Sequence, residues 1–160
     1  MRPIQLKISD LARVAEVTRF QADGLLDEVF VNQPLGKKSG GSHRTFSPQE
    51  MLVYVVAHEI EQKYGVRRSI LALIADHLRR ALTGPRPASR EARLLVTFVP
   101  PSTTYLNSGT QVEEGIVLHL GPVFARVDEY LGVSGLHGAN NQLPLPPVIA
   151  TRRPGGTQSG

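Results

Sequence analysis

The chain has 160 residues, a formal net charge of +4, a pI of about 9.8, 41% hydrophobic residues and 6% aromatic residues. It contains no cysteine, which excludes disulfides, thiolate-bound zinc and iron–sulfur clusters. No run approaches the ~20 apolar residues of a membrane span and the first residues lack an apolar signal core, so we expect a cytoplasmic, nucleoid-associated protein that has no membrane partner.

The positive charge is concentrated in the first half of the chain. Residues 1–93 carry 15 lysines and arginines against 10 acidic residues, whereas residues 94–160 carry 3 against 4. A basic domain attracts polyanions because neutralising phosphates releases counterions. Many soluble domains carry a similar excess for solubility alone. The positions of the cations on the predicted elements therefore matter more than their number.

Residues 8–30 predict two short helices joined by a tight turn. Ser9 is placed to cap a helix over residues 10–15, and Thr18 to cap a second helix over residues 19–30. This spacing is typical of a helix-turn-helix, in which the first helix braces the second in the major groove of DNA. The candidate base-reading residues of the second helix are Thr18, Arg19, Phe20, Gln21 and Asp23.

A glycine-rich, basic segment follows at residues 31–47. Gly36, Gly40 and Gly41 allow the positive φ angles of a turn. The segment predicts a basic wing whose polar side chains meet phosphates or the minor groove beside the second helix. The alternative is a solvated loop with lysines for solubility. The candidate DNA contacts of the wing are Lys37, Lys38, Ser42, His43 and Arg44.

Ser47, Pro48 and Glu50 form a strong start signal for a third helix. They supply an N-cap hydroxyl, a proline at the first helical position and a carboxylate three residues after the cap. We expect this helix to run to about Lys63 and to end at Gly65.

A fourth helix is predicted over residues 67–82. Its apolar stripe is wide and includes Ile70 and Leu73. Arg79 and Arg80 lie near its end, where cations interact favourably with the helix dipole.

The order of these elements over residues 8–82 resembles the DNA-binding domain of MerR-type regulators. The most similar segments are Arg44-Thr45-Phe46-Ser47-Pro48-Gln49-Glu50, which is similar to the family's Arg-x-Tyr-Ser/Thr-x-x-Asp/Glu pattern with Phe46 at the tyrosine position, and the run from Gly65 to Ile70. The resemblance implies that Arg44 holds a phosphate, that residues 18–23 read bases and that the turn at residues 63–68 acts as a second wing. The second wing would add Lys63, Tyr64, Arg67 and Arg68 to the DNA contacts.

The second half predicts a smaller appendage. Residues 93–99 and 115–120 predict strands separated by a loop at residues 100–110, and residues 123–131 predict a helix. About forty residues with two strands cannot easily form an independent core. We therefore expect this piece either to pack on the first domain or to complete a sheet with a second subunit. Such a homodimer would suit tandem DNA half-sites.

The sequence thus predicts a mainly α protein with a small β component, in which a winged helix-turn-helix precedes a strand-strand-helix appendage. The expected regions are a DNA-binding domain at residues 1–83, a linker at 84–92, a small α/β region at 93–133 and a flexible Gly/Pro-rich tail at 134–160. We expect a regulator of transcription that binds double-stranded DNA with sequence preference.

Two other classes remain open from the sequence. One is a DNA-architectural adaptor, such as an excisionase-like factor or a phage small terminase-like subunit; the other is a protein-interaction module with a protein partner in place of DNA. We expect no enzyme, no cofactor and no metal. The adjacent side chains of His58 and Glu59 diverge by about 100° around a helix, and no His-Glu-x-x-His pattern occurs.

Overall fold

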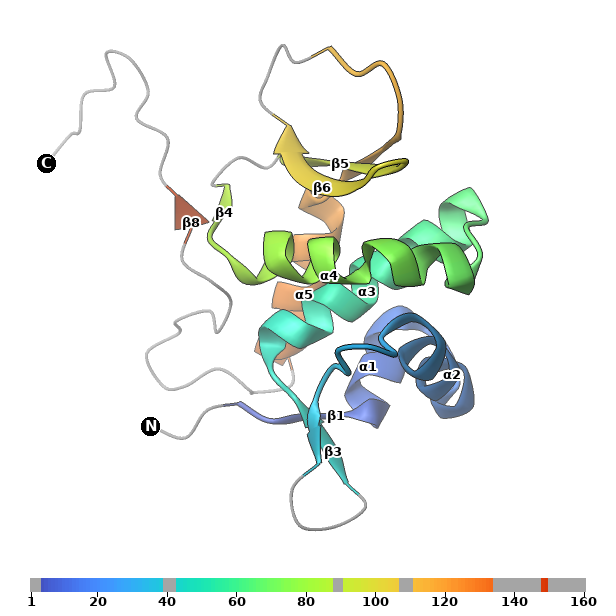
Figure 1. Cartoon of the computed structure of the whole chain (residues 1–160). Helices are drawn as coiled ribbons and strands as arrows, with labels where there is room; N and C mark the ends of the chain where they lie inside the picture. The colour runs from blue at the N-terminus through green and yellow to red at the C-terminus, as the bar shows by residue number, and fades with distance from the viewer. Residues whose placement is uncertain (1–3, 39–42, 88–90, 107–110, 134–147, 150–160) are drawn as a thin grey trace, which may run out of the picture.

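The computed structural model describes residues 4–38, 43–87, 91–106, 111–133 and 148–149. These residues form a mixed α/β structure with five helices and two small antiparallel three-stranded sheets. Helices α3 (Pro48–Tyr64) and α4 (Arg68–Thr83) lie across the middle of the molecule (Figure 1). The first two helices and the first sheet lie at one end, and strands of the second sheet lie at the other.

Helices α1 (Ile8–Ala15) and α2 (Arg19–Val29) form the predicted pair. The buried residues of α2 are Ala22, Leu25, Leu26 and Val29, which follow the i, i+3, i+4, i+7 spacing of one helix face. The expected Ser9 cap is wrong, because Lys7 occupies the N-cap position and α1 begins at Ile8. The Lys7 backbone N–H donates to Asp10 Oδ2 at 2.7 Å, so the carboxylate three residues ahead determines where the helix starts.

The first sheet joins the chain before α1 to the segment before α3. Strand β3 (Arg44–Phe46) lies between β1 (Leu6–Lys7) and β2 (Lys37–Lys38) and is antiparallel to both. Lys38 lies opposite Arg44 in the β2–β3 pair. We call β2 and β3 the basic hairpin; Gly40, Gly41 and Ser42 lie outside the described residues.

Helix α3 forms the centre of the core. Every residue from Met51 to Ala57 is buried, because α1, α4 and α5 all pack against this helix. The wide stripe predicted for α4 is wrong at two positions, since Ile70 is 38% exposed and Leu73 is 57% exposed. The face of α4 that is covered is narrower and contains Leu71, Ile74, Ala75, Leu78 and Leu82.

The second sheet has the order β6-β5-β7, with β5 (Arg93–Phe98) antiparallel to β6 (Pro101–Leu106) and to β7 (Ile116–His119). The loop expected at residues 100–110 is wrong, because residues 101–106 form β6. Pro100 and Pro101 favoured a loop in the sequence. Pro101 is nevertheless tolerated, because it is the first residue of β6 and β6 pairs only with β5 in the described sheet. The Thr103-Thr104-Tyr105 run has high strand propensity.

The second half packs on the first half rather than standing apart. Strands β5 and β6 contact α4, and α5 (Gly121–Val133) contacts α3 and α1. Arg126 of α5 donates to Glu59 Oε1 at 2.8 Å, and Tyr130 donates to Asp10 Oδ1 at 2.5 Å. Burial disfavours the charge of Glu59, but hydrogen bonds from Lys63 and Arg126 outweigh it and lower its pKa.

The predicted linker and tail contribute a short parallel pair, in which β4 (Arg86–Pro87) lies beside β8 (Val148–Ile149). Residues 134–147 and 150–160 of the tail lie outside the described residues. Among the described helices, none has the length and apolar character needed to cross a bilayer.

His58 is half-buried in α3, on the helix that forms the centre of this packing. Both of its ring nitrogens are buried without a hydrogen-bond partner among the described residues, and its ring stacks on Tyr54 with centroids 6.2 Å apart. Burial lowers the pKa of His58, although Glu61 and Glu59 favour its charged form. The same burial raises the pKa of Tyr54 to about 12.

We predict that His58 makes the folded protein less stable on mild acidification. The unfolded chain binds the His58 proton below pH ~6.5, whereas the folded chain resists binding it until a lower pH. The free energy of unfolding should therefore fall as the pH drops from about 7 through this window. Urea titrations at a series of pH values measure this free energy of unfolding. It should depend less steeply on pH in His58→Leu than in wild type, whereas His119→Gln, an exposed control on β7, should keep the wild-type dependence. Identical pH slopes in all three proteins would contradict this role.

Candidate nucleic-acid interface

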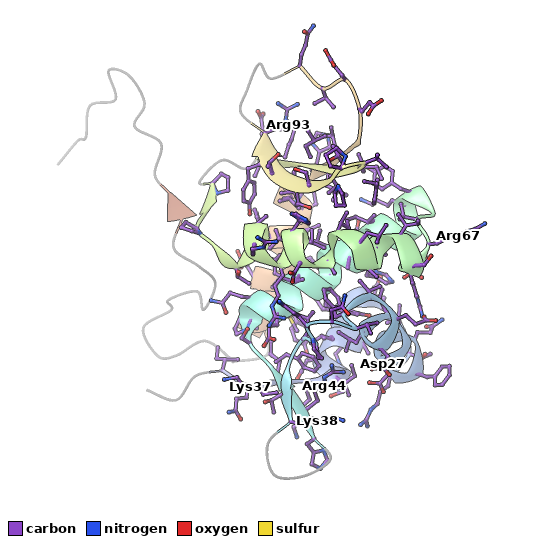
Figure 2. The ribbon with its side chains drawn as sticks, viewed as in Figure 1. Asp27, Lys37, Lys38, Arg44, Arg67 and Arg93 are labelled. Carbon is purple, nitrogen blue, oxygen red and sulfur yellow. The ribbon has the colours of Figure 1, made fainter. Side chains whose placement is uncertain are left out.

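A concave surface lies between α2 and the basic hairpin. We call it the α2–hairpin groove, and its lining residues are Lys7, Ile8, Ser9, Arg19, Phe20, Asp23, Asp27, Lys38, His43 and Arg44. The basic hairpin extends from the same end of the molecule as α2, and Figure 2 shows Asp27, Lys38 and Arg44 close together there. The groove thus unites residues that the sequence assigned separately to a recognition helix and to a wing.

The groove carries more positive than negative charge. Lys7, Arg19, Lys38 and Arg44 supply four cations, whereas Asp23 and Asp27 supply two carboxylates. The first turn of α2 contains no acidic residue, so no side chain there offsets the positive end of the helix dipole. This combination suits a polyanionic ligand.

A capping box fixes the start of α2. The Thr18 hydroxyl accepts from the Gln21 backbone N–H at 3.1 Å, and the Gln21 side chain accepts from the Thr18 backbone N–H at 2.9 Å. Thr18 and Gln21, two of the predicted base-reading residues, therefore also hold the start of the helix in place. Arg19 and Phe20, between them, point exposed side chains outward from this fixed first turn.

Arg44 connects the basic hairpin to α2. Its guanidinium lies 5.8 Å from the centroid of the Phe46 ring, and its Nη1 atom lies 3.7 Å from Asp27 Oδ1. The Arg44 side chain is 17% exposed, whereas that of Asp27 is 73% exposed. Such an exposed pair contributes only about 0–1 kcal/mol to stability. Its effect is to hold the Arg44 charge at a defined place beside the helix.

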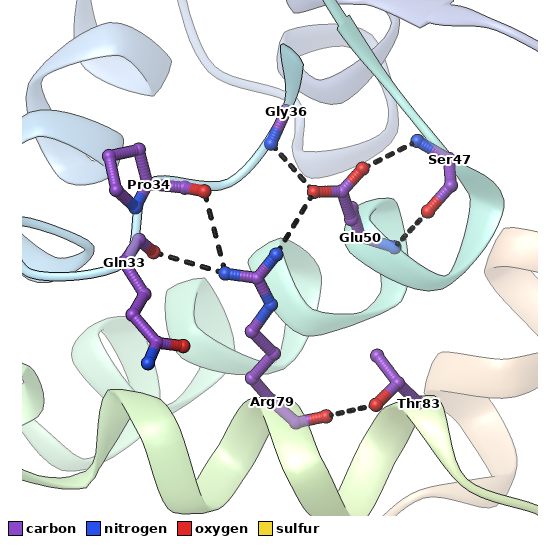
Figure 3. Close-up of polar contacts among 7 residues, drawn as sticks. All are labelled: Gln33, Pro34, Gly36, Ser47, Glu50, Arg79 and Thr83. Atoms are coloured by element: carbon purple, nitrogen blue, oxygen red, sulfur yellow. Dashed lines mark hydrogen bonds and ion pairs between the residues drawn. The ribbon is translucent and has the colours of Figure 1, made fainter.

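The carboxylate of Glu50 joins the start of α3 to the segment that enters β2 (Figure 3). Oε1 accepts from the Ser47 backbone N–H at 3.0 Å, and the Ser47 hydroxyl accepts from the Glu50 backbone N–H at 3.1 Å, which confirms the predicted cap. Oε2 accepts from the Gly36 backbone N–H at 2.6 Å. The side chain that starts α3 therefore also anchors the chain entering β2.

Gly36 tolerates no side chain at this anchor. Its φ is +85°, and an added Cβ would lie 2.8 Å from the Phe46 ring and 2.9 Å from the Thr45 carbonyl oxygen. The predicted turn glycine is thus required by both backbone conformation and space.

Arg79 connects the same carboxylate to α4 (Figure 3). Its Nη2 lies 3.6 Å from Glu50 Oε2, and its Nη1 donates to the carbonyls of Gln33 and Pro34 at 3.2 and 3.4 Å. The Arg79 guanidinium therefore satisfies loop carbonyls of the preceding segment, and Arg80 is the basic residue of the last turn of α4. Arg80 instead lies 4.0 Å from Asp76 on the helix surface.

The residues of the predicted second wing lie outside the groove. Lys63 Nζ is 2.9 Å from Glu59 Oε2, and the Tyr64 hydroxyl donates to the Val117 carbonyl of β7 at 3.1 Å. Arg67 is exposed at the N-cap of α4, well away from Lys38 and Arg44 in Figure 2.

Arg68, the fourth of these residues, is engaged within the protein. It forms ion pairs with Glu28 of α2 and Glu61 of α3, and the hydrogen bond to Glu28 is the main cause of its raised pKa. A Cβ on Gly24 would lie 3.0 Å from Arg68 Nη1, which accounts for a glycine inside a helix. The glycine costs ~1 kcal/mol in helix propensity but lets the guanidinium lie close to α2.

Lys7, Ile8, Ser9 and Asp27 line the groove but were not predicted as site residues from the sequence. Asp27 could have been found, because it lies four residues after Asp23 and therefore on the same face of α2. Lys7 is distant in sequence and reaches the groove through the pairing of β1 with β3. Lys37 is exposed on β2 but does not line the groove. Successive side chains of a strand point to opposite faces, so Lys37 and its neighbour Lys38 are expected to point in different directions.

No set of three His, Cys, Asp or Glu side chains in the described ranges is arranged to hold a metal ion. Comparison of the chain with protein-family models, with curated proteins and with solved structures finds no match.

The Glu50 contacts predict a measurable cost of substitution. Glu50→Ala should lower the free energy of unfolding by about 2–3 kcal/mol, because it removes the cap and leaves the Gly36 N–H without its acceptor. Glu50→Gln should cost less, since an amide oxygen still caps the helix. Urea denaturation provides the measurement. Glu129→Ala, an exposed control on α5, should stay within about 0.5 kcal/mol of wild type; an equally small effect of Glu50→Ala would refute the anchor.

Proposed function

We propose that the chain binds double-stranded DNA as a winged helix-turn-helix protein and regulates transcription. In this proposal α2 enters the major groove and the basic hairpin contacts the adjacent backbone. The observation that carries the proposal is the α2–hairpin groove, where the exposed start of α2 and the cations of the hairpin line one surface.

The dimensions and burial of α2 support this placement. An α-helix with its side chains is about 10–12 Å in diameter, and the major groove is about 12 Å wide, so α2, with its eleven residues, can lie in it. Ala22, Leu25 and Leu26 anchor one side of α2 in the core, while Arg19, Phe20 and Gln21 are exposed. A helix held on one side and exposed along its start can present several side chains to base edges.

The charged residues divide into two proposed roles. Lys7, Lys38 and Arg44 come from the sheet side of the groove and would contact phosphates, which fixes position without reading sequence. Arg19 and Asp23 come from α2 and would read base edges, since arginine pairs with guanine and a carboxylate accepts from the cytosine amino group. A regulator of tandem half-sites would act as the homodimer expected from the sequence.

A salt series tests the phosphate contacts. Purified protein is titrated with duplex DNA at several salt concentrations, and the slope of log affinity against log salt is compared between variants. Lys38→Ala/Arg44→Ala should reduce the magnitude of the slope by about 2 for all sequences, because two phosphates are no longer neutralised. Arg93→Ala on β5, at the opposite end of the molecule in Figure 2, should leave the slope unchanged.

Two results would contradict the proposal. Wild-type protein that binds no duplex at low salt would show that the groove is a solvated surface. A slope that falls equally in the Arg93→Ala protein would show that the interface lies elsewhere. Arg67→Ala tests the second wing separately, and we expect no change because Arg67 lies outside the groove.

Removing a carboxylate from the groove should have the opposite effect. Asp27→Asn should raise the affinity for duplex DNA about fivefold at low salt, because a like charge near the phosphates costs on the order of 1 kcal/mol. Fluorescence anisotropy on one duplex gives the comparison, with Glu129→Gln on α5 as the charge-matched control. A lower affinity for Asp27→Asn would instead mean that its hold on Arg44 matters more than its charge.

A further inference from the structure

Phe20 is an aromatic residue with an exposed side chain at the start of α2. Its side chain is 87% exposed, although it lies in the first turn of α2 and lines the α2–hairpin groove. Apart from Phe20 and Ile8, the lining side chains of the groove are polar or charged. An aromatic ring in water amid cations leaves apolar area available for burial against a ligand.

The described fold does not require this ring. The first turn of α2 is held by the capping box of Thr18 and Gln21. The positions at which apolar residues brace a helix start, one before the cap and four after it, are occupied by Val17 and Ala22. Phe20 therefore contributes little to the start of the helix, and its apolar surface calls for another explanation.

A DNA duplex offers one apolar group where α2 would face it. The base edges in the major groove present hydrogen-bond donors and acceptors, and the single apolar feature among them is the C5-methyl group of thymine. Arg19 and Asp23 are spaced four residues apart and share a face of α2, so Phe20 projects beside the polar pair rather than between its members.

We infer that Phe20 is a specificity-determining residue that contacts a thymine C5-methyl group next to the base pair faced by Arg19 and Asp23. The inference rests on the proposed binding of double-stranded DNA, and it adds the chemical group that the ring recognises. A duplex carrying thymine at that position is therefore preferred over one carrying a pyrimidine without the methyl group.

The experiment removes the methyl group alone. A duplex selected from random sequence by the wild-type protein is resynthesised with deoxyuridine in place of each thymine in turn, which preserves base pairing. Wild-type affinity should fall about fourfold at one position, the change expected for one buried methyl group. Phe20→Ala should bind the thymine duplex at least as weakly as wild type binds the deoxyuridine duplex, and it should not distinguish the two.

The control is Val99→Ala, because Val99 is an equally exposed apolar residue in the connection between β5 and β6. This variant should keep the wild-type response to deoxyuridine. Equal wild-type affinity for thymine and deoxyuridine duplexes would overturn the inference while leaving the proposed function intact. Loss of affinity in Phe20→Ala for both duplexes, with the methyl effect retained, would also overturn it and would indicate contact with sugars or insertion between bases. If selection recovers no duplex, the proposed function itself fails.

Discussion

The carboxylate of Glu50 is the interaction on which the geometry of the groove depends. One oxygen caps α3, the other accepts from Gly36 at the entrance to the basic hairpin, and Arg79 approaches from α4. These contacts are partly buried, so they are screened less by water than the exposed pairs of the surface. The hairpin is consequently attached to the core at its base, and Arg44 is held at a defined distance from α2.

The elements that line the groove pack on one continuous core. Helix α3 is buried on all sides from Met51 to Ala57, and elements from both halves of the chain pack around it. The second half therefore supports the helix pair from behind instead of forming an independent unit. The hydrogen bond from Tyr130 to Asp10 also links α5 to α1, so the second half of the chain braces the first helix as well.

Local signals predicted much of this fold, and long-range contacts account for what they missed. The caps at Thr18 and Ser47 depend on residues three positions away, so sequence spacing located both helices. The strand at residues 101–106 was missed because its prolines signal a loop unless the pairing partner is known. The contacts of Arg68 and Arg79 join residues up to 46 positions apart, and no local pattern reveals them. Six of the ten residues predicted for the second helix and the wing line the groove: Arg19, Phe20, Asp23, Lys38, His43 and Arg44. Thr18, Gln21, Lys37 and the residues of the second wing do not line it, and Ser42 lies outside the described residues.

The measurement that tests the account most directly is amide hydrogen exchange with and without duplex DNA. The account predicts slower exchange in peptides covering α1, α2 and β3, with little change in the turn at residues 63–68 or in β6 and β7. Protection confined to the second sheet, or protection of the turn at residues 63–68 in place of α2, would contradict the assignment of the α2–hairpin groove as the DNA-binding surface.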